Sequence, residues 1–324
     1  MATIAVWQLA RTNDVVVAAT DPPMLSIFLQ PVIQLRNAKL INWHHDLYPE
    51  ILEGLGWSTR GPRRIALRLL TWLRNQSLRT AVANIVPGQL MRDHLLANGV
   101  PPRSLHIIHN WSDDEAIRPV SHFENGLRRQ WHFKPEHFVV AYSGNLGRAH
   151  DIETLLMAIQ HFADATDATA YNVRFLFVGG GFHYVSLRSA INRHSQIVTF
   201  QPYQPRASLT YSLSVADVHL TILRRELEGL VVPSKLYGIA AAGRPIIHIG
   251  APDGEIARVL TAGRCGFAVA EGDGDGLVKA IRQLADNRER AASMGFRARQ
   301  LLEQSYTRRS ALAAWHRIID DASG

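Results

Sequence analysis

Short apolar runs alternate with helix-length segments from one end of this chain to the other, and this alternation limits the possible folds most. It is typical of α/β proteins with parallel sheets, because a helix usually makes the crossover between two parallel strands. In the first half, strands are expected at 14–19, 39–44, 83–86 and 105–109. The helices expected there cover 23–36, 62–80 and 87–98.

The second half has the same order and is longer. Its expected strands are 138–142, 173–178, 197–200, 218–223 and 245–249. Its expected helices are 151–163, 184–194, 206–215, 234–242, 254–261 and 274–285. This half suffices for a complete doubly wound domain. The first half lacks opening strands and a glycine-rich first loop, so we expect the chain to start inside its N-terminal domain.

Composition predicts a globular protein of two domains, since 324 residues with 47% apolar content can bury a large core. The net charge of +7 suits phosphate groups, anionic lipid or nucleic acid. The lone Cys265 excludes an internal disulfide and favours a reducing cytoplasm. No apolar run is long enough for a membrane span, and no Cys/His spacing indicates a metal.

Residues 228–245 place an acid, a glycine turn and a helix start after one expected strand. Pro233–Ser234 can open the helix. Free N–H groups at the helix start and the Lys235 cation would suit a phosphorylated ligand. Glu228 would accept a hydrogen bond from a ligand hydroxyl. The stretch alone also fits an ordinary helix between two strands.

Glycines follow two other expected strands. Residues 143–148 (SGNLGR) come directly after the strand at 138–142, and Gly179–Gly181 follows the next strand. Glycines let a backbone approach an anion closely, and both turns should open at the carboxyl edge of one sheet, where such folds bind ligands. Together with 228–235 they predict a phosphate-binding pocket.

Two histidines and an aspartate end a strand in the first half. Alternation sends His44 and His45 to opposite faces, which makes them poor partners for one metal ion. One of them would face a cleft as a polar or acid–base group. The other interpretation is that a histidine and Asp46 cap the turn at 47–50.

The segment 60–79 is basic and amphipathic. Ile65, Leu69, Trp72 and Leu73 share one helical face, and Arg64, Arg68, Asn75 and Arg79 line the opposite face. An anionic membrane surface would attract such a helix. Alternatively, the helix packs its Leu and Trp residues into its own domain. Lysine-rich runs and basic patches with interleaved aromatics are absent, which argues against a nucleic-acid partner.

The second half resembles the nucleotide-sugar domain of retaining glycosyltransferases of family 4, which have the GT-B fold. The matching motifs occur in order along the chain: 142–155, 175–181, 198–223, the acidic signature at 228–233, Gly243-Arg244-Pro245, 253–256 and 263–272. In the first half, 14–23, 45–50 and 100–110 are similar to the family's N-terminal domain.

The resemblance implies two Rossmann-like doubly wound domains facing across a cleft, the N-terminal one incomplete. The N-terminal, acceptor-side domain would be 1–135, with 111–135 as the inter-domain connection. The nucleotide-sugar domain would be 136–305, and a helix at 306–324 would cross back to the first domain. The implied reaction moves a sugar, with retention, from a nucleotide-diphosphate donor to an acceptor hydroxyl, with the donor as substrate and neither cofactor nor metal.

The resemblance also assigns residues to the donor diphosphate. Gly144 and Asn145 would approach it with Gly180 in the neighbouring turn, and Lys235 would supply positive charge to the leaving group. The family's usual Arg and Lys in this region are Asn145 and His150 here, and Arg148 with Lys235 would compensate.

On the sugar side, Glu228 would lie near the hydroxyls. The backbone amides that follow it would turn to the donor, and they belong to Gly229, Leu230 and Val231. His45 is the candidate polar group in the cleft, with His44 second. The family's second glutamate, which holds the ribose, is replaced by Gly238, with two extra residues after Pro233.

The Pro-Ser-Lys form of the signature resembles a subgroup that builds cell-surface polysaccharides. We therefore expect a hexosyltransferase with a lipid-linked or glycan acceptor, cytoplasmic and peripheral on the inner face of the plasma membrane through 60–79. The alternatives are a non-hydrolysing nucleotide-sugar epimerase of the same fold, and a truncated non-catalytic nucleotide-sugar-binding protein.

Overall fold

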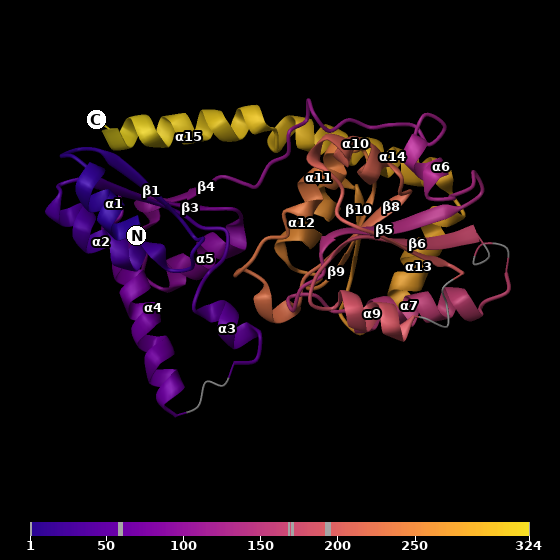
Figure 1. The fold of residues 1–324 in the computed structure, drawn as a ribbon, viewed down its shortest axis with the longest axis horizontal. Helices are drawn as coiled ribbons and strands as arrows, with labels where there is room; N and C mark the ends of the chain where they lie inside the picture. The colour runs from indigo at the N-terminus through magenta and orange to yellow at the C-terminus, as the bar shows by residue number, and fades with distance from the viewer. Residues whose placement is uncertain (1, 58–60, 168, 170–171, 192–195, 324) are drawn as a thin grey trace. The chain divides into compact units, whose positions relative to one another are not determined.

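The structure is a computed structural model that describes residues 2–57, 61–167, 169, 172–191 and 196–323. Contacts within the chain divide it into two compact units (Figure 1). Unit 1 consists of 1–110, 226–232 and 309–324. Unit 2 consists of 111–225 and 233–308.

Unit 1 is built on a four-stranded parallel sheet in the order β1-β2-β3-β4. Its strands are β1 (Val15–Ala19), β2 (Lys39–Trp43), β3 (Ala83–Val86) and β4 (Leu105–Ile107). Its helices are α1 (Ala2–Leu9), α2 (Leu25–Leu35), α3 (Glu50–Gly54), α4 (Pro62–Thr80), α5 (Gln89–Ala97), the 3-10 turn η1 (Pro102–Ser104) and α15 (Arg308–Ser323). The Trp315 ring of α15 lies 5.1 Å from that of Trp43, so the last helix packs within this unit.

Unit 2 has a six-stranded parallel sheet in the order β10-β9-β8-β5-β6-β7. Its strands are β5 (Phe138–Asn145), β6 (Val173–Gly180), β7 (Val198–Gln201), β8 (Val218–Ile222), β9 (Ile246–Ile249) and β10 (Gly266–Val269). Its helices are α6 (Gly126–Gln130), α7 (Glu153–Asp164), α9 (Tyr184–Ala190), η3 (Arg206–Ser208), α10 (Leu209–Ser214), α11 (Lys235–Ala241), α12 (Glu255–Gly263), α13 (Gly274–Ala285) and α14 (Arg288–Ser305). The 3-10 turn η4 (Arg225–Leu227) begins in unit 2 and ends in unit 1.

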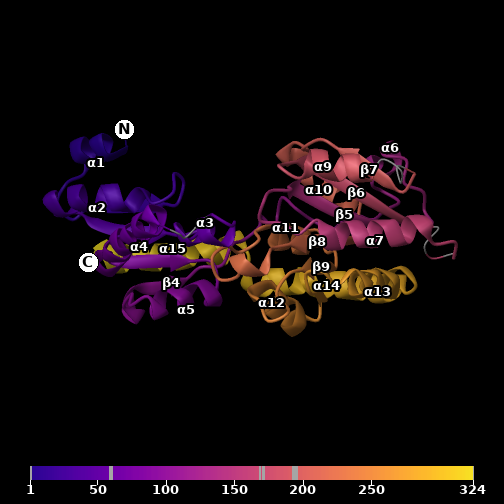
Figure 2. The same ribbon diagram turned by 90° about the horizontal axis from the view of Figure 1, so that it is seen from below.

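The sheet of unit 2 is buried on both faces, as expected for parallel strands flanked by helices (Figure 2). Along β5, Phe138, Val140 and Tyr142 belong to one apolar cluster, which includes α7 and α13. The alternate residues Val139 and Ala141 belong to a second cluster on the other face. This alternation follows from the two-residue period of a strand.

The prediction of an α/β fold is confirmed, and each expected strand is present: β3 has the expected ends, and the others differ by one to three residues at an end. Helices α1, α3, α6 and α14 and strand β10 were not predicted. The helix expected at 151–163 begins at Glu153, because Asp151 accepts a hydrogen bond from the Glu153 amide (3.0 Å) before the first turn. Residues 192–194 of the helix expected at 184–194 and residue 60 of the basic segment lie outside the described residues.

The segment 111–135, expected to connect the domains, belongs to unit 2 instead. Trp131 and Phe133 are buried in the second apolar cluster beside β5 and β6. The Asn125 side chain donates to the Tyr211 carbonyl (2.8 Å). The segment thus completes one face of the sheet, because its aromatic residues cover strand positions that would otherwise meet water.

Asp217 is the centre of a buried charge network in unit 2. Its carboxylate accepts hydrogen bonds from the Val139 amide (2.8 Å) and from Arg128 (3.1 Å), and Arg288 lies 3.5 Å away. Arg128 also donates to the carbonyls of Val215 and His137. The network ties the segment before β5 to the start of β8.

We expect Asp217→Ala to destabilise unit 2 by about 3 to 5 kcal/mol, because it leaves the Arg128 charge buried without its carboxylate. The control is Asp167→Ala, which removes a largely solvent-exposed pair with Arg282 and should cost about 0 to 1 kcal/mol. Urea unfolding followed by tryptophan fluorescence measures both. Equal losses in the two variants would contradict the structural role of Asp217.

Candidate functional site

The strand order of unit 2 reverses direction between β5 and β8. From β5 the chain proceeds outward to β6 and β7, and from β8 it proceeds the other way to β9 and β10. The segments that follow β5 and β8 come together at this point, since the Arg224 amide donates to the Ala149 carbonyl (2.9 Å). A reversal of this kind opens a crevice at the carboxyl ends of the strands, where α/β proteins bind ligands.

The first residues of the two predicted glycine loops are the last residues of β5 and β6, and the two strands are paired there. Gly144 is in register with Gly179, and Asn145 with Gly180. Both Gly144 (φ +129°) and Gly179 (φ +127°) have backbone angles that favour glycine, and a Cβ on Gly179 would collide with the Gly144 carbonyl oxygen. The absence of side chains therefore allows β5 and β6 to stay paired to their last residues.

Lys235, the first residue of α11, lies against this glycine end. A Cβ on Gly144 would be 2.7 Å from the Lys235 Cε atom, and the Lys235 ammonium lies 5.3 Å from the centre of the Tyr142 ring. Burial lowers the pKa of Lys235. Among the described residues, no carboxylate lies within 4.0 Å of its ammonium. A partly buried cation with no acidic partner is suited to binding an anionic ligand.

Asn145 and Arg148 are exposed in the same region. The Arg148 guanidinium lies 4.2 Å from the centre of the Phe182 ring, a cation–π contact. In unit 2 the structure therefore brings together Gly144, Asn145, Gly180 and Lys235, and Arg148 is in the same loop. Their assignment to a diphosphate stays a prediction.

The acidic segment after β8 packs on unit 1, although it was expected in the nucleotide-sugar domain. Leu230 accepts a hydrogen bond from the Leu47 amide (3.0 Å), and Val231 forms an antiparallel bridge with Asp46. Gly229 (φ +74°) approaches the backbone of α5, where a Cβ would be 3.5 Å from the Leu90 carbonyl oxygen. Glu228 to Val231 thus lie beside the loop that carries His45, and not in the same unit as Lys235.

His44 and His45 point in different directions, as the alternation predicted. His45 is exposed; its amide donates to Thr20 (3.1 Å), and its ring centre lies 4.7 Å from that of Trp43. Partial burial of the ring lowers the pKa of His45, although nearby Asp46 and a hydrogen bond with Asn110 act in the opposite direction. No side chain caps α3, which argues against a purely capping role for this motif.

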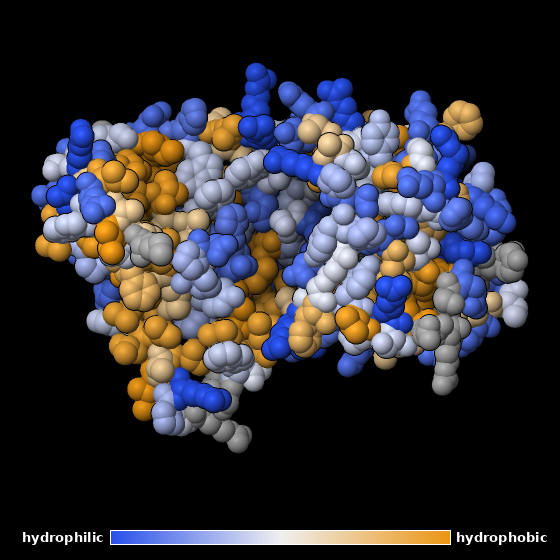
Figure 3. All heavy atoms as spheres, viewed as in Figure 1, coloured by the Kyte–Doolittle hydropathy of each residue, from blue (hydrophilic) through white to orange (hydrophobic). Residues whose placement is uncertain are grey.

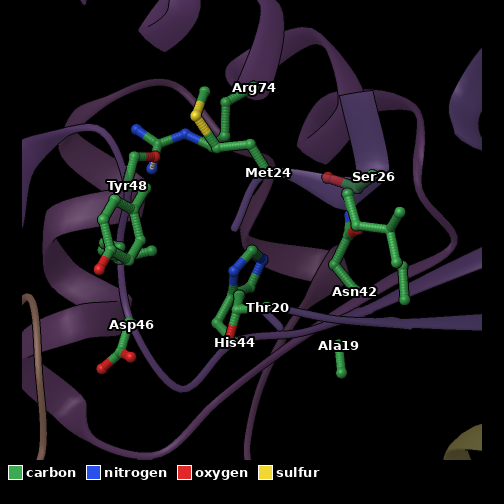
Figure 4. Close-up of a pocket in the computed structure, with 12 residues that line it drawn as sticks. Ala19, Thr20, Met24, Ser26, Asn42, His44, Asp46, Tyr48 and Arg74 are labelled. Atoms are coloured by element: carbon green, nitrogen blue, oxygen red, sulfur yellow. Dashed lines mark hydrogen bonds between the residues drawn. The ribbon is translucent and has the colours of Figure 1, made fainter. Parts of the chain in front are cut away.

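His44 is 5% exposed and faces a small cavity inside unit 1 (Figure 4). Burial, and then the charge of Arg74, lower the pKa of His44 to about 3. The His44 Nε2 atom has no hydrogen-bond partner, and Asn42 also lines the space. The room for the centre of a water molecule is ≈ 20 Å³, which fits one water and excludes a sugar ring.

Two groups of residues were missed by the sequence analysis. Arg74 is buried in α4, pairs with Glu50 and donates to the Tyr48 carbonyl (3.2 Å), which holds the loop after His45. Tyr142 and His150 bond to the backbone of the 143–148 loop. For Arg74, the only indication in the sequence was an arginine within the helix expected at 62–80.

Comparison with known proteins bears on the class of protein. Residues 137–287 match the family model of group 1 glycosyl transferases, and residues 2–116 match that of glycosyltransferase family 4. The probable glycosyltransferase WbjE of Pseudomonas aeruginosa is 28% identical over 299 residues, covering 92% of this chain and 72% of WbjE.

A second relative is the putative colanic acid biosynthesis glycosyl transferase WcaI of Escherichia coli K12. It is 24% identical over 212 residues, which are 65% of this chain and 51% of WcaI. Among solved structures, Anabaena HepE in complex with UDP superposes with a TM-score of 0.78 at 15% identity, over 98% of this chain and 82% of HepE.

Two parallel-sheet α/β units, together with the structural match to HepE, define the GT-B fold. The two family matches and the WbjE match are similarities to glycosyltransferases, and the WbjE match extends over 92% of the chain.

We expect Gly144→Ala to displace the Lys235 side chain, because the new methyl group would be 2.7 Å from Cε and φ is +129°. The Lys235 pKa should then rise towards its ordinary value, which NMR of ¹³C-labelled lysine Cε measures. Gly147→Ala is the control, since its nearest atom would be 3.4 Å away, in ordinary contact. A Lys235 signal unchanged by Gly144→Ala would contradict the close packing.

Proposed function

We propose that this protein is a retaining, metal-independent hexosyltransferase. Its donor is a nucleotide-diphosphate sugar, and its acceptor is a lipid-linked or glycan hydroxyl in cell-surface polysaccharide biosynthesis. The observation that carries the proposal is Lys235, a partly buried cation without a described acidic partner, packed on Gly144 at the end of β5, which is paired there with β6.

Properties of similar proteins support the choice of donor and pathway. HepE has been crystallised in complex with UDP and with UDP-glucose. WcaI is named for colanic acid biosynthesis, which makes a polysaccharide. The low identity to HepE shows the fold alone, so the nature of the donor rests on the site in unit 2.

In the proposed reaction, the bond from the sugar C1 to the diphosphate breaks and the acceptor oxygen bonds to C1 on the same face. The departing diphosphate takes the electron pair of the broken bond and accepts the proton that the acceptor hydroxyl releases. Lys235 stabilises negative charge on the departing diphosphate, which is the kind of electrostatic term that dominates many enzymes. His45, whose pKa is lowered by burial, and Glu228 are proposed to hydrogen-bond the sugar.

The decisive experiment incubates the protein with a panel of radiolabelled nucleotide sugars and a lipid extract, then analyses the products. Lys235→Met should weaken donor binding and transfer by about 100-fold or more, because it removes the charge facing the diphosphate. Lys134→Met, at an exposed lysine in the same unit, is the control. A free epimerised nucleotide sugar as product would exclude the transferase, and unchanged donor binding in Lys235→Met would remove Lys235 from the site.

We further propose that the acceptor is reached at an anionic membrane. No helix in the described ranges is both long and apolar enough to span a bilayer. The apolar face of α4 is directed to solvent: Ile65, Leu69 and Trp72 are 72%, 55% and 54% exposed. The alternative, in which this face packs into the domain, is wrong for these three residues, because Leu67, Arg74 and Leu78 are buried instead.

Neighbouring helices extend this exposed apolar surface. Helix α2 packs on both α1 and α4, and its Phe28 is exposed. Figure 3 shows apolar side chains gathered over this part of unit 1. The exposed residues Arg63, Arg64 and Arg68 on α4 add positive charge, so apolar insertion and attraction to anionic headgroups would act together. This surface supports a peripheral location on the inner face of the plasma membrane.

We expect the double variant Leu69→Glu and Trp72→Glu to lose at least tenfold in binding to phosphatidylglycerol vesicles, measured by sedimentation. The acidic side chains remove apolar area and repel the headgroups. Phe296→Glu is the control, because Phe296 is equally exposed on α14 in unit 2. Equal binding by the wild type and the double variant would contradict docking through α4.

A further inference from the structure

Tyr142, which is buried, and His150, which is partly buried, form a pair under the glycine loop of unit 2. Tyr142 is on β5, and its hydroxyl lies 2.7 Å from the Asn145 carbonyl oxygen and 3.0 Å from His150 Nε2. His150 Nδ1 lies 2.9 Å from the Gly147 carbonyl oxygen. The two rings meet edge to face at 5.7 Å. The pair therefore binds carbonyl groups at two points of the 143–148 loop.

These contacts fix the direction of the loop's peptide groups. Carbonyl and N–H point in opposite directions across a trans peptide. The Asn145 carbonyl accepts a hydrogen bond from Tyr142, so the Leu146 amide of the same peptide points away from Tyr142. It donates to the Gly180 carbonyl (2.7 Å). In the same way, the Gly147 carbonyl on His150 turns the Arg148 amide away from the pair. Tyr142 and His150 thus set the shape of the backbone next to Lys235.

The three contacts need three protons, and the uncharged pair has two. A carbonyl oxygen only accepts, so the Tyr142 hydroxyl donates to Asn145 and His150 Nδ1 donates to Gly147. The contact between Tyr142 and His150 Nε2 then lacks a proton unless the ring is an imidazolium. Protonation of His150 would complete the network, since Nε2 would donate to the Tyr142 oxygen.

Other charges oppose that protonation while no ligand is bound. Burial lowers the pKa of His150 to about 4, with contributions from Lys235 and His183. The basic residues near His150 come from three elements. Lys235 is at the start of α11, and His183 is in the turn before α9. Arg224 follows β8, and its amide donates a hydrogen bond to the Ala149 carbonyl. Arg148 lies in the loop itself. The Asp151 carboxylate is turned to the first turn of α7, where it accepts from the Glu153 amide.

We propose that Tyr142 and His150 are positioning residues for the donor diphosphate, and that His150 takes up a proton when the diphosphate binds. The inference rests on the proposed function of unit 2. The Lys235 ammonium lies over the Tyr142 ring, and His150 lies on the hydroxyl of that ring. Because the bound diphosphate offsets the positive charge of Lys235, it makes the charged form of His150 more favourable. The completed network then holds the loop closed on the ligand.

The test is isothermal titration calorimetry with UDP-glucose, and with any donor that binds more tightly in the panel above. A nucleotide-diphosphate sugar lacks the terminal phosphate that titrates near pH 6, so proton uptake reports on the protein. In buffers of different ionisation enthalpy, the wild type should take up a measurable fraction of one proton at pH 7. Its affinity should rise as the pH falls from 8 to 6, by at most tenfold per pH unit.

His150→Gln and Tyr142→Phe should each weaken binding by about tenfold and abolish the proton uptake. The controls are His161→Gln, on exposed α7 surface, and Tyr184→Phe, which removes a hydroxyl bonded to the Gln201 carbonyl (3.2 Å) away from the loop. Both should bind and take up protons like the wild type. A loss of affinity in His150→Gln without loss of proton uptake would mean a merely structural role and would overturn the inference.

The two proposals fail in different ways. If the wild type binds a nucleotide sugar without proton uptake, the inference about His150 is overturned and the donor site stands. If no nucleotide sugar binds at any pH, the proposed function of unit 2 is overturned, and the inference with it.

Discussion

The pairing of β5 with β6 to their last residues is the constraint on which the candidate donor site depends. Gly144 and Gly179 lie side by side in this ladder, and a side chain on Gly179 would collide with the Gly144 carbonyl. Two strands can stay this close only where glycine removes the Cβ atom. The bare backbone that results is the surface on which Lys235 lies and under which Tyr142 packs.

The charges of unit 2 are arranged in two different ways, and the difference separates structure from function. Asp217 is surrounded by Arg128, Arg288 and backbone donors, so each charge has a partner within the protein. Lys235 has no such acidic partner among the described residues. A net charge of +7 does not distinguish these situations. The partners of each cation distinguish them. An unpaired, partly buried charge costs free energy, and a bound anion would recover it.

The sequence predicted most strands well because each of them is a short apolar run bounded by turn residues, and β3, β5, β6, β8 and β9 are buried along most of their length. Helix α14 was missed, since its buried residues include the small Ala291, Gly295 and Ala298, which give a weak apolar period. Strand β10 is short and largely not buried, so it also lacked a signal. In α4, the apolar stripe is exposed and Arg74 is buried, an inversion that depends on the partner Glu50 and is invisible in the pattern itself.

The position of Glu228 was the least predictable part of the site, because backbone atoms decide it. After Arg225 the chain enters unit 1, where Leu230 bonds to Leu47 and Val231 pairs with Asp46, and it returns to unit 2 at Pro233. Backbone groups make these bonds whatever the side chain is, so the residue types in the sequence do not reveal them. Glu228 and Lys235, neighbours in one motif, therefore depend on the integrity of different units. Effects of substituting Glu228 have to be compared with the stability of unit 1, and effects of substituting Lys235 with that of unit 2, before either is assigned to chemistry.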